Sequence, residues 1–194
     1  MYDVATNLHK VKDSLPDGVR LIAISKYHPN EYIEAAYNEG QRMFGESHEQ
    51  ELSAKAKTLP TDIEWHFIGH LQSNKVKYIA PYISMIEAVD TLKLLKEINK
   101  QAAKLLEEGD WCELKNVHIS GLMMMASNTD DTEQIRREMT LAANFFDEVK
   151  AKYFADDPEF KERSWGMSSD YEIAIDCRST MIRVGTAIFG PRVY

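Results

Sequence analysis

The chain has 194 residues, of which 44% are hydrophobic and 28% are charged, as expected for one folded domain or two small ones. Its net charge of −8 argues against a general nucleic-acid or anionic-membrane binder, because those partners are themselves negative. The opening stretch "MYDVATNLHKVKDSL" lacks the apolar core of a signal peptide, and no apolar run approaches the roughly 18 residues of a membrane-spanning helix. We therefore expect a cytoplasmic protein whose Cys112 and Cys177 are free thiols.

Short apolar runs alternate with longer amphipathic segments along the chain, after a leading helix expected over residues 2–14. Seven runs are predicted to be strands: 21–26, 42–47, 64–69, 85–90, 117–126, 163–168 and 179–190. Helices are predicted between them, for example at "PNEYIEAAYNEG", from Thr91 to about Gly109, and at "TEQIRREMTLAANFFDEVKAKYF". This alternation is typical of the α/β class with parallel strands, arranged as a TIM-type (βα)8 barrel or a doubly wound sheet.

Polar residues and a glycine stand where the predicted strands end. They are Lys26, Glu46, Ser47, His70, Asp90, Ser127, Asn128, Ser168, Gly185 and Thr186. Because ligands of parallel α/β folds bind beyond the carboxyl ends of the strands, this set indicates a site for an anionic small molecule. It does not indicate a metal site, since His66 and His70 would lie about 13 Å apart along a strand. We interpret His66 as a packing residue.

Lys26 ends the apolar run "LIAISK". Desolvation disfavours an ammonium ion, so a lysine at this position can lose its proton near neutral pH and form a Schiff base with an aldehyde. The alternative is that Lys26 simply reaches solvent at the end of a strand.

The segment "IRVGTAIFG" at 182–190 indicates a phosphate site. Gly185 would let a ligand approach the backbone, and Thr186 adds a hydroxyl donor. Ser168 either binds the same phosphate or caps the helix that follows it. Arg183 lies two residues before Gly185, so it points to the same face of the strand and needs a carboxylate or a ligand as its partner.

Five motifs together resemble the pyridoxal phosphate homeostasis protein family: "ISKYHP", "FGESHEQEL", "WHFIGHLQSNKVK", "SWGMSSDYEIAI" and "STMIRVGTAIFGPR". The resemblance covers nearly the whole chain. It implies a single domain over 1–194, a (βα)8 barrel like the N-terminal domain of alanine racemase. It also implies a protein that binds pyridoxal 5′-phosphate (PLP) and takes part in vitamin B6 homeostasis without established catalytic turnover.

The resemblance implies eight PLP-binding residues: Lys26, Ser47, His70, Ser168, Ser179, Arg183, Gly185 and Thr186. Lys26 would form the Schiff base, and Arg183 would face the pyridine nitrogen. Ser168, Gly185 and Thr186 would hold the phosphate, with Ser179 nearby. Ser47 stands where many members of the family have Asn.

An arginine stays protonated, so Arg183 would not protonate the pyridine ring, and carbanion chemistry would be discouraged. PLP held in this way could be passed to another amine. We expect a monomer whose partners are PLP and PLP-dependent apoenzymes, with no nucleic acid and no membrane.

The chain departs from the family in two places. It is shorter than usual, and the pattern near Lys104 looks like two helices joined after the loss of one βα unit. Either the chain is a shortened variant or a segment is absent from the sequence, and we favour the second. In "DCRSTMIR", Arg178 stands where the family usually has Gly; it either strains a tight turn or adds positive charge near the phosphate.

Two enzyme functions are the alternatives. A PLP-dependent amino-acid racemase needs two bases on opposite faces of its substrate, and alanine racemases take the second from an additional C-terminal domain that we do not expect after Tyr194. A Schiff-base aldolase would also use a strand-borne lysine, but the family motifs argue against it.

Overall fold

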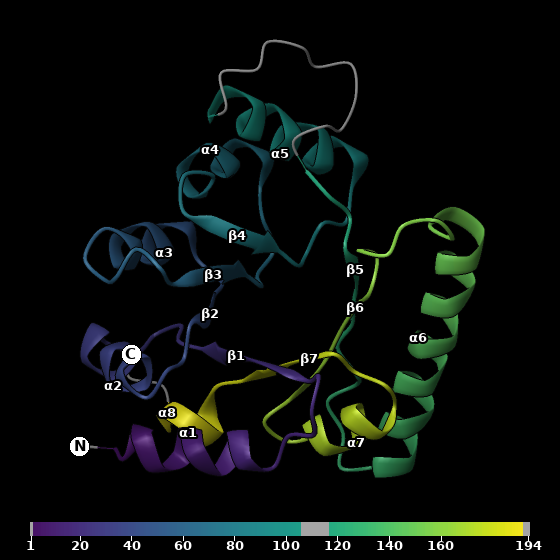
Figure 1. Ribbon diagram of the computed structural model, residues 1–194, viewed down its shortest axis with the longest axis horizontal. Helices are drawn as coiled ribbons and strands as arrows, with labels where there is room; N and C mark the ends of the chain where they lie inside the picture. The colour runs from purple at the N-terminus through teal and green to yellow at the C-terminus, as the bar shows by residue number, and fades with distance from the viewer. Residues whose placement is uncertain (1, 106–116, 192–194) are drawn as a thin grey trace. The chain divides into compact units, whose positions relative to one another are not determined.

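The computed structural model describes residues 2–105 and 117–191, in which helices and strands alternate (Figure 1). No helix within those ranges has the length and apolar character that a membrane crossing would need. The chain divides into two compact units, which we describe separately. The first unit comprises Met1–Gln41 with Ser120–Tyr194, and the second unit comprises Arg42–Ile119.

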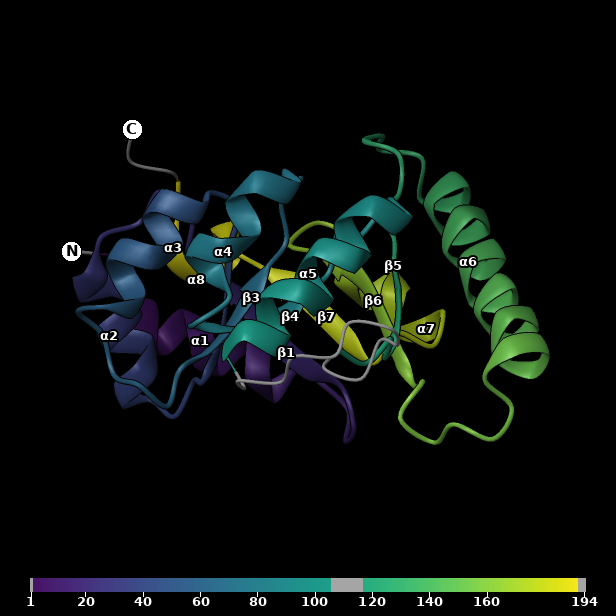
Figure 2. The same ribbon diagram turned by 90° about the horizontal axis from the view of Figure 1, so that it is seen from above.

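The first unit contains four parallel strands in the spatial order β1-β7-β6-β5 (Figure 2). Their bounds are β1 Arg20–Ile24, β5 Gly121–Met123, β6 Glu162–Met167 and β7 Met181–Val184. β1 and β7 are buried along almost their whole length, as parallel strands covered on both faces are. The register places Ile22 beside Arg183, so both strands end at the same edge of the sheet.

Five helices belong to the first unit: α1 Val4–Asp13, α2 Asn30–Asn38, α6 Thr132–Tyr153, α7 Tyr171–Asp176 and α8 Thr186–Phe189. α6 begins after Asp131, whose carboxylate accepts hydrogen bonds from the amides of Glu133 and Gln134. Its apolar residues recur every three or four positions and pack into a buried cluster with Phe160 and Trp165. This packing fixes the long helix against β6 and α7.

The second unit contains three parallel strands in the order β2-β3-β4. They are β2 Met43–Glu46, β3 Glu64–Phe67 and β4 Ile83–Ile86, and the helices are α3 Glu49–Ala56, α4 Val76–Ile79 and α5 Leu92–Leu105, with a 3-10 turn at Ser73–Lys75. Lys55 is buried and donates hydrogen bonds to Glu46 at 2.8 Å and to Glu51 at 2.7 Å. Because both carboxylates face this ammonium group, its burial is compensated.

The predicted order of seven strands is confirmed for the described residues, but several predicted boundaries are wrong. β4 ends at Ile86, so Glu87 follows the strand instead of lying inside it. The run 179–190 is not one strand, because β7 stops at Val184 and α8 begins at Thr186, after Gly185. The helix predicted from Thr91 to about Gly109 is observed as α5, Leu92–Leu105. The remainder of that helix and most of the join predicted near Lys104 lie outside the described residues.

Arg178 has a φ of 66°, in the left-handed region that favours glycine, directly after α7. Of the two alternatives for this residue, the strained turn is therefore the one observed. Its guanidinium donates hydrogen bonds to Asp147 at 2.6 Å and Asn144 at 3.0 Å on α6. The hydrogen bond from Arg178, and after it the one from Arg163, lowers the pKa of the Asp147 carboxyl. Arg178 precedes β7, whereas Gly185 follows it, so its charge lies at the opposite end of the strand from the predicted phosphate site.

We expect Arg178→Gly to be more stable than Arg178→Ala by about 1 kcal/mol, measured as the difference in free energy of unfolding in urea. Both substitutions remove the contacts with Asp147 and Asn144, but only glycine adopts a positive φ without strain. The difference between the two variants therefore isolates the backbone strain. Equal stability of the two variants would show that the turn is not strained.

Candidate functional site

Lys26 lies two residues after β1, in a turn with constrained geometry. Ser25 before it is fully buried, and the Lys26 side chain is partly buried. Tyr27 after it has a φ of 65°, which is a genuine outlier for a bulky residue and costs on the order of 1–3 kcal/mol. Such strain persists only where the surrounding structure enforces it, so the lysine is held at the end of β1 by a defined backbone turn.

Ser168 and Gly185 come together beyond the ends of β6 and β7. The Gly185 amide donates a hydrogen bond of 3.2 Å to Ser168 Oγ, which leaves the serine hydroxyl proton available for another acceptor. A Cβ at Gly185 would lie 3.1 Å from the carbonyl oxygen of Ile24, the last residue of β1. The ends of β1, β6 and β7 therefore converge here. Thr186 begins α8 next to this point, and it is exposed.

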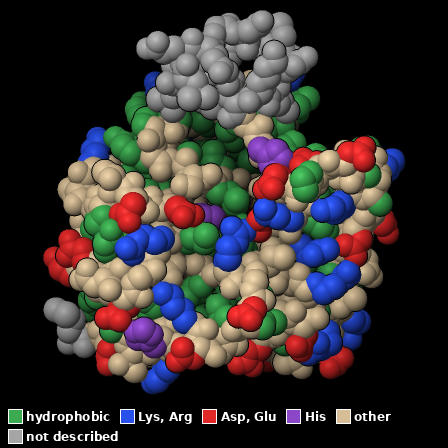
Figure 3. Space-filling model, in the orientation of Figure 1, with side chains coloured by type: hydrophobic (Ala, Val, Ile, Leu, Met, Phe, Trp, Pro, Cys, Tyr) green, Lys and Arg blue, Asp and Glu red, His purple; other side chains and the backbone are tan. Residues whose placement is uncertain are grey.

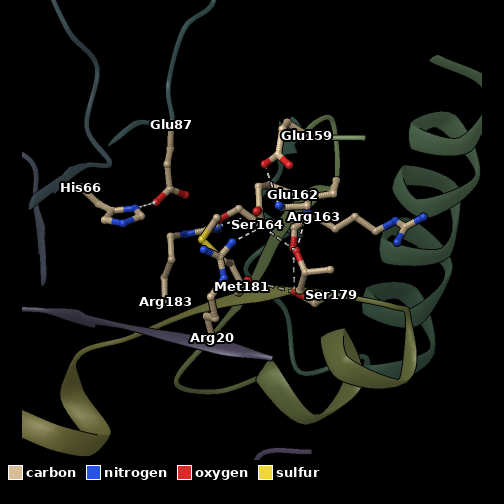
Figure 4. Close-up of polar contacts among 12 residues, drawn as sticks. Arg20, His66, Glu87, Glu159, Glu162, Arg163, Ser164, Ser179, Met181 and Arg183 are labelled. Atoms are coloured by element: carbon tan, nitrogen blue, oxygen red, sulfur yellow. Dashed lines mark hydrogen bonds and ion pairs between the residues drawn. The ribbon is translucent and has the colours of Figure 1, made fainter. Parts of the chain in front are cut away.

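Arg183 is buried in β7, and its guanidinium reaches across β6 (Figure 4). Nη1 donates to the carbonyl oxygen of Ser164 at 2.7 Å and to its hydroxyl at 2.6 Å, and Nη2 donates to the carbonyl oxygen of Met124 at 2.8 Å. The sequence predicted a carboxylate or a ligand as the partner. The three oxygens named here are neutral, and they hold the guanidinium across β6.

Ser179 lies at the other end of β7. Its hydroxyl is within 3.0 Å of the carbonyl oxygens of Arg163, Trp165 and Met181, and it is buried (Figure 4). Gly185 lies six positions further along the chain, a span of about 20 Å when extended. The structure therefore does not bring Ser179 to the predicted phosphate site; its hydroxyl anchors the entry into β7.

Ser47 and His70 follow β2 and β3 in the second unit. A Cβ at Gly69 would lie 2.5 Å from the carbonyl oxygen of Ser47, so the two loops pass each other at a distance that only glycine allows. The His70 side chain is 73% exposed, and its Nδ1 lies 3.5 Å from Asp90 Oδ2. His70 and Asp90 line an open pocket of about 380 Å³ together with Asn74 and Lys93.

Sequence reasoning missed the pairing of His66 with Glu87. His66 Nδ1 lies 3.0 Å from Glu87 Oε1, and both side chains are almost fully buried (Figure 4). His66 is buried, as a packing residue would be, but its ring is also held by Glu87. An acidic residue directly after the apolar run "ISMI" was the available signal for Glu87. No group of three or more His, Cys, Asp or Glu side chains among the residues described is placed to hold a metal ion.

Comparison with known proteins relates this arrangement to a family. Residues 109–193 match the family model described as alanine racemase, N-terminal domain. A pyridoxal phosphate homeostasis protein from Vibrio alginolyticus is 34% identical, over 92% of this chain and 89% of its own length. This chain belongs to the pyridoxal phosphate homeostasis protein family. The family member from Escherichia coli K12 is 32% identical in an alignment of 240 residues that covers all 194 residues here, so that relative has additional segments.

Solved structures confirm the fold class predicted for this family member. PipY from Synechococcus elongatus, whose structure was determined with PLP bound, superposes with a TM-score of 0.86 at 32% identity, over 96% of this chain and 100% of PipY. An alanine racemase from Clostridium difficile superposes with a TM-score of 0.76 at 16% identity and shows the fold alone, over 97% of this chain and 56% of the enzyme. The seven described strands fit this fold with one βα unit missing.

Proposed function

We propose that this chain binds PLP and takes part in PLP homeostasis in the cytoplasm, without catalytic turnover. The observation that carries the proposal is the hydrogen bond from the Gly185 amide to Ser168, beyond the ends of β6 and β7. The end of β1 lies beside Gly185, and Lys26 comes two residues after β1. The names of the relatives and the PLP bound to PipY support it.

The residues at this point fit the phosphate group of PLP. The hydroxyls of Ser168 and Thr186 bring hydrogen-bond donors to the start of α8, and the Gly185 amide holds Ser168 Oγ beside them. Backbone amides and hydroxyls at the start of a short helix after the last strands are the usual phosphate ligands of this class of fold. We infer that these three residues hold the phosphate.

Lys26 is the residue that we propose to hold the other end of PLP. When bound, PLP supplies an aldehyde that a neutral lysine amine can attack to form a Schiff base. Lys26 is partly buried, two residues after the end of β1. The bond is reversible, so an amine from a PLP-dependent apoenzyme could displace Lys26. This favours a protein that passes PLP on over one that only retains it.

Arg183 is the residue that we propose to face the pyridine nitrogen. Guanidinium groups do not release protons in proteins, and two nitrogens of this one already donate to Ser164 and Met124. Arg183 therefore supplies positive charge to the ring without supplying a proton. A ring without that proton is a weaker electron sink, which fits a protein that binds PLP without turnover.

The phosphate assignment predicts a ligand-specific effect of Ser168→Ala. We expect its affinity for PLP to fall about 10-fold or more, because a hydrogen bond to a charged group contributes roughly 1.5–3 kcal/mol. Its affinity for pyridoxal, which lacks the phosphate, should stay unchanged. Fluorescence titration of both ligands measures the two constants, and Ser169→Ala, at the exposed neighbouring position, is the matched control. Equal losses for PLP and pyridoxal would place Ser168 away from the phosphate.

A further inference from the structure

The residues from Ser25 to His28 form a tight turn directly after β1. The His28 amide donates a hydrogen bond of 3.1 Å to the carbonyl oxygen of Ser25, which closes the turn around Lys26 and Tyr27. Of these two central residues only Tyr27 has a positive φ, of 65°. This is the pattern of a type II turn, whose third residue is ordinarily Gly or Asn because other residues are strained there.

Both ends of this turn are fixed by packing. Ser25 is fully buried, and His28 is 4% exposed. The His28 ring stacks on Tyr32 of α2 with 5.8 Å between the centroids, and its centroid lies 5.3 Å from that of Phe189, the last residue of α8. Because both ends are packed in place, the backbone must turn within the two residues between them, and this holds Tyr27 at its strained φ.

The backbone of Lys26 depends on the conformation of its neighbour. A residue at position 27 that rejects a positive φ has to flip the peptide between residues 26 and 27 or to shift one of the buried ends of the turn. Either change alters the backbone from which the Lys26 side chain extends. A displacement of about 1 Å between reacting groups can lower a rate about 100-fold, so the turn is suited to control the chemistry of the lysine.

We propose that Tyr27 is a positioning residue for Lys26, whose left-handed backbone conformation holds the lysine where its amine reacts with PLP. The proposal rests on the proposed function. In the reaction, the amine nitrogen forms a C=N bond with the aldehyde carbon, and its two protons leave with the aldehyde oxygen as water. The role belongs to the φ of residue 27 and not to the tyrosine ring.

Substitutions graded by their tolerance of a positive φ test this proposal. Tyr27→Gly adopts that φ without strain, so it should unfold at a higher urea concentration than Tyr27→Ala and form the Schiff base like wild type. Tyr27→Val, with a β-branched side chain, should form the Schiff base at least about 10-fold more slowly. Tyr27→Ala should lie between these two, and it replaces Tyr27→Val if that variant does not fold. Stopped-flow absorbance with PLP measures the rates.

Pyridoxamine 5′-phosphate separates the position of the lysine from general damage to the site. It keeps the ring and the phosphate of PLP but has an amine in place of the aldehyde, so every folded variant should bind it like wild type in a fluorescence titration. The matched control is Arg178→Val. Arg178 has nearly the same φ, 66°, but precedes β7, so this variant should be less stable than wild type and form the Schiff base at the wild-type rate.

The outcomes distinguish this proposal from the function on which it rests. Equal rates in Tyr27→Gly and in folded Tyr27→Val or Tyr27→Ala would overturn the positioning role and leave Lys26 as the residue that bonds PLP. Weaker binding of pyridoxamine 5′-phosphate in the slow variants would also overturn it, because the whole site would then be damaged. Absence of a Schiff base on Lys26 in the wild-type protein would instead contradict the proposed function itself.

Discussion

A Lys26→Ala variant is expected to bind PLP at least about 100-fold more weakly than wild type and to lack the visible absorbance of a lysine-bound PLP. The loss is large because the proposed bond is covalent, and the remaining contacts hold only the phosphate and the ring. Absorbance titration with PLP measures both effects at once. The stability of the variant should change little, because the side chain is only partly buried after the end of β1.

Two further variants make this prediction specific to the amine. Lys26→Arg keeps a positive charge but cannot form the bond, so it should resemble Lys26→Ala in colour and in weak binding. Lys10→Ala removes an exposed lysine of α1 in the same unit and should behave like wild type. Tight binding with unchanged colour in Lys26→Arg would contradict the role of Lys26.

An Arg183→Ala variant is expected to lose about 2–4 kcal/mol of stability, measured by urea unfolding without ligand. The substitution leaves the Met124 carbonyl and the Ser164 hydroxyl without the buried donor that now satisfies them, and it opens a cavity beside β6. Arg183→Lys should recover part of the loss, because one ammonium can still reach some of these oxygens.

The matched control for Arg183 is Arg178→Ala. Arg178 is about half exposed, and its ion pair with Asp147 is worth about 1 kcal/mol or less. The two arginines therefore differ mainly in burial. Equal losses at the two positions would show that the hydrogen bonds of Arg183 contribute little to folding.

Much of the fold could be predicted from the sequence because parallel strands are short apolar runs between amphipathic helices. β1 is such a run, "RLIAI", buried along almost its whole length. The boundaries were harder to predict. The run 179–190 stays apolar across Gly185, and only the local backbone turns the strand into α8. Hydrophobicity alone does not mark that change.

The sequence likewise predicts some features of the candidate site and not others. Lys26, Ser168 and Gly185 stand out in the sequence because each lies within two residues of the end of a strand. The partners of Arg183 could not, since Ser164 and Met124 are distant in sequence and are joined to it only by the pairing of β5, β6 and β7. Ser179 was assigned to the phosphate from its motif, although it stands before β7, whereas the ligand end of a parallel strand is its carboxyl end.

The face of the protein shown in Figure 3 gives little further guidance to function. Acidic and basic side chains are interspersed over the face shown in Figure 3, in keeping with the modest net charge of −8. We therefore propose that PLP is recognised by local groups at the strand ends and not by the charge of this face.

The most direct test of the account is to treat wild-type protein with PLP, reduce it with borohydride and locate the adduct by peptide mass mapping. Reduction makes the bond between PLP and an amine permanent, so the modified residue is identified directly. We expect one pyridoxyl group per chain, on the peptide that contains Lys26. An adduct on another lysine, or no adduct in folded protein, would contradict the proposal that this family member holds PLP through Lys26.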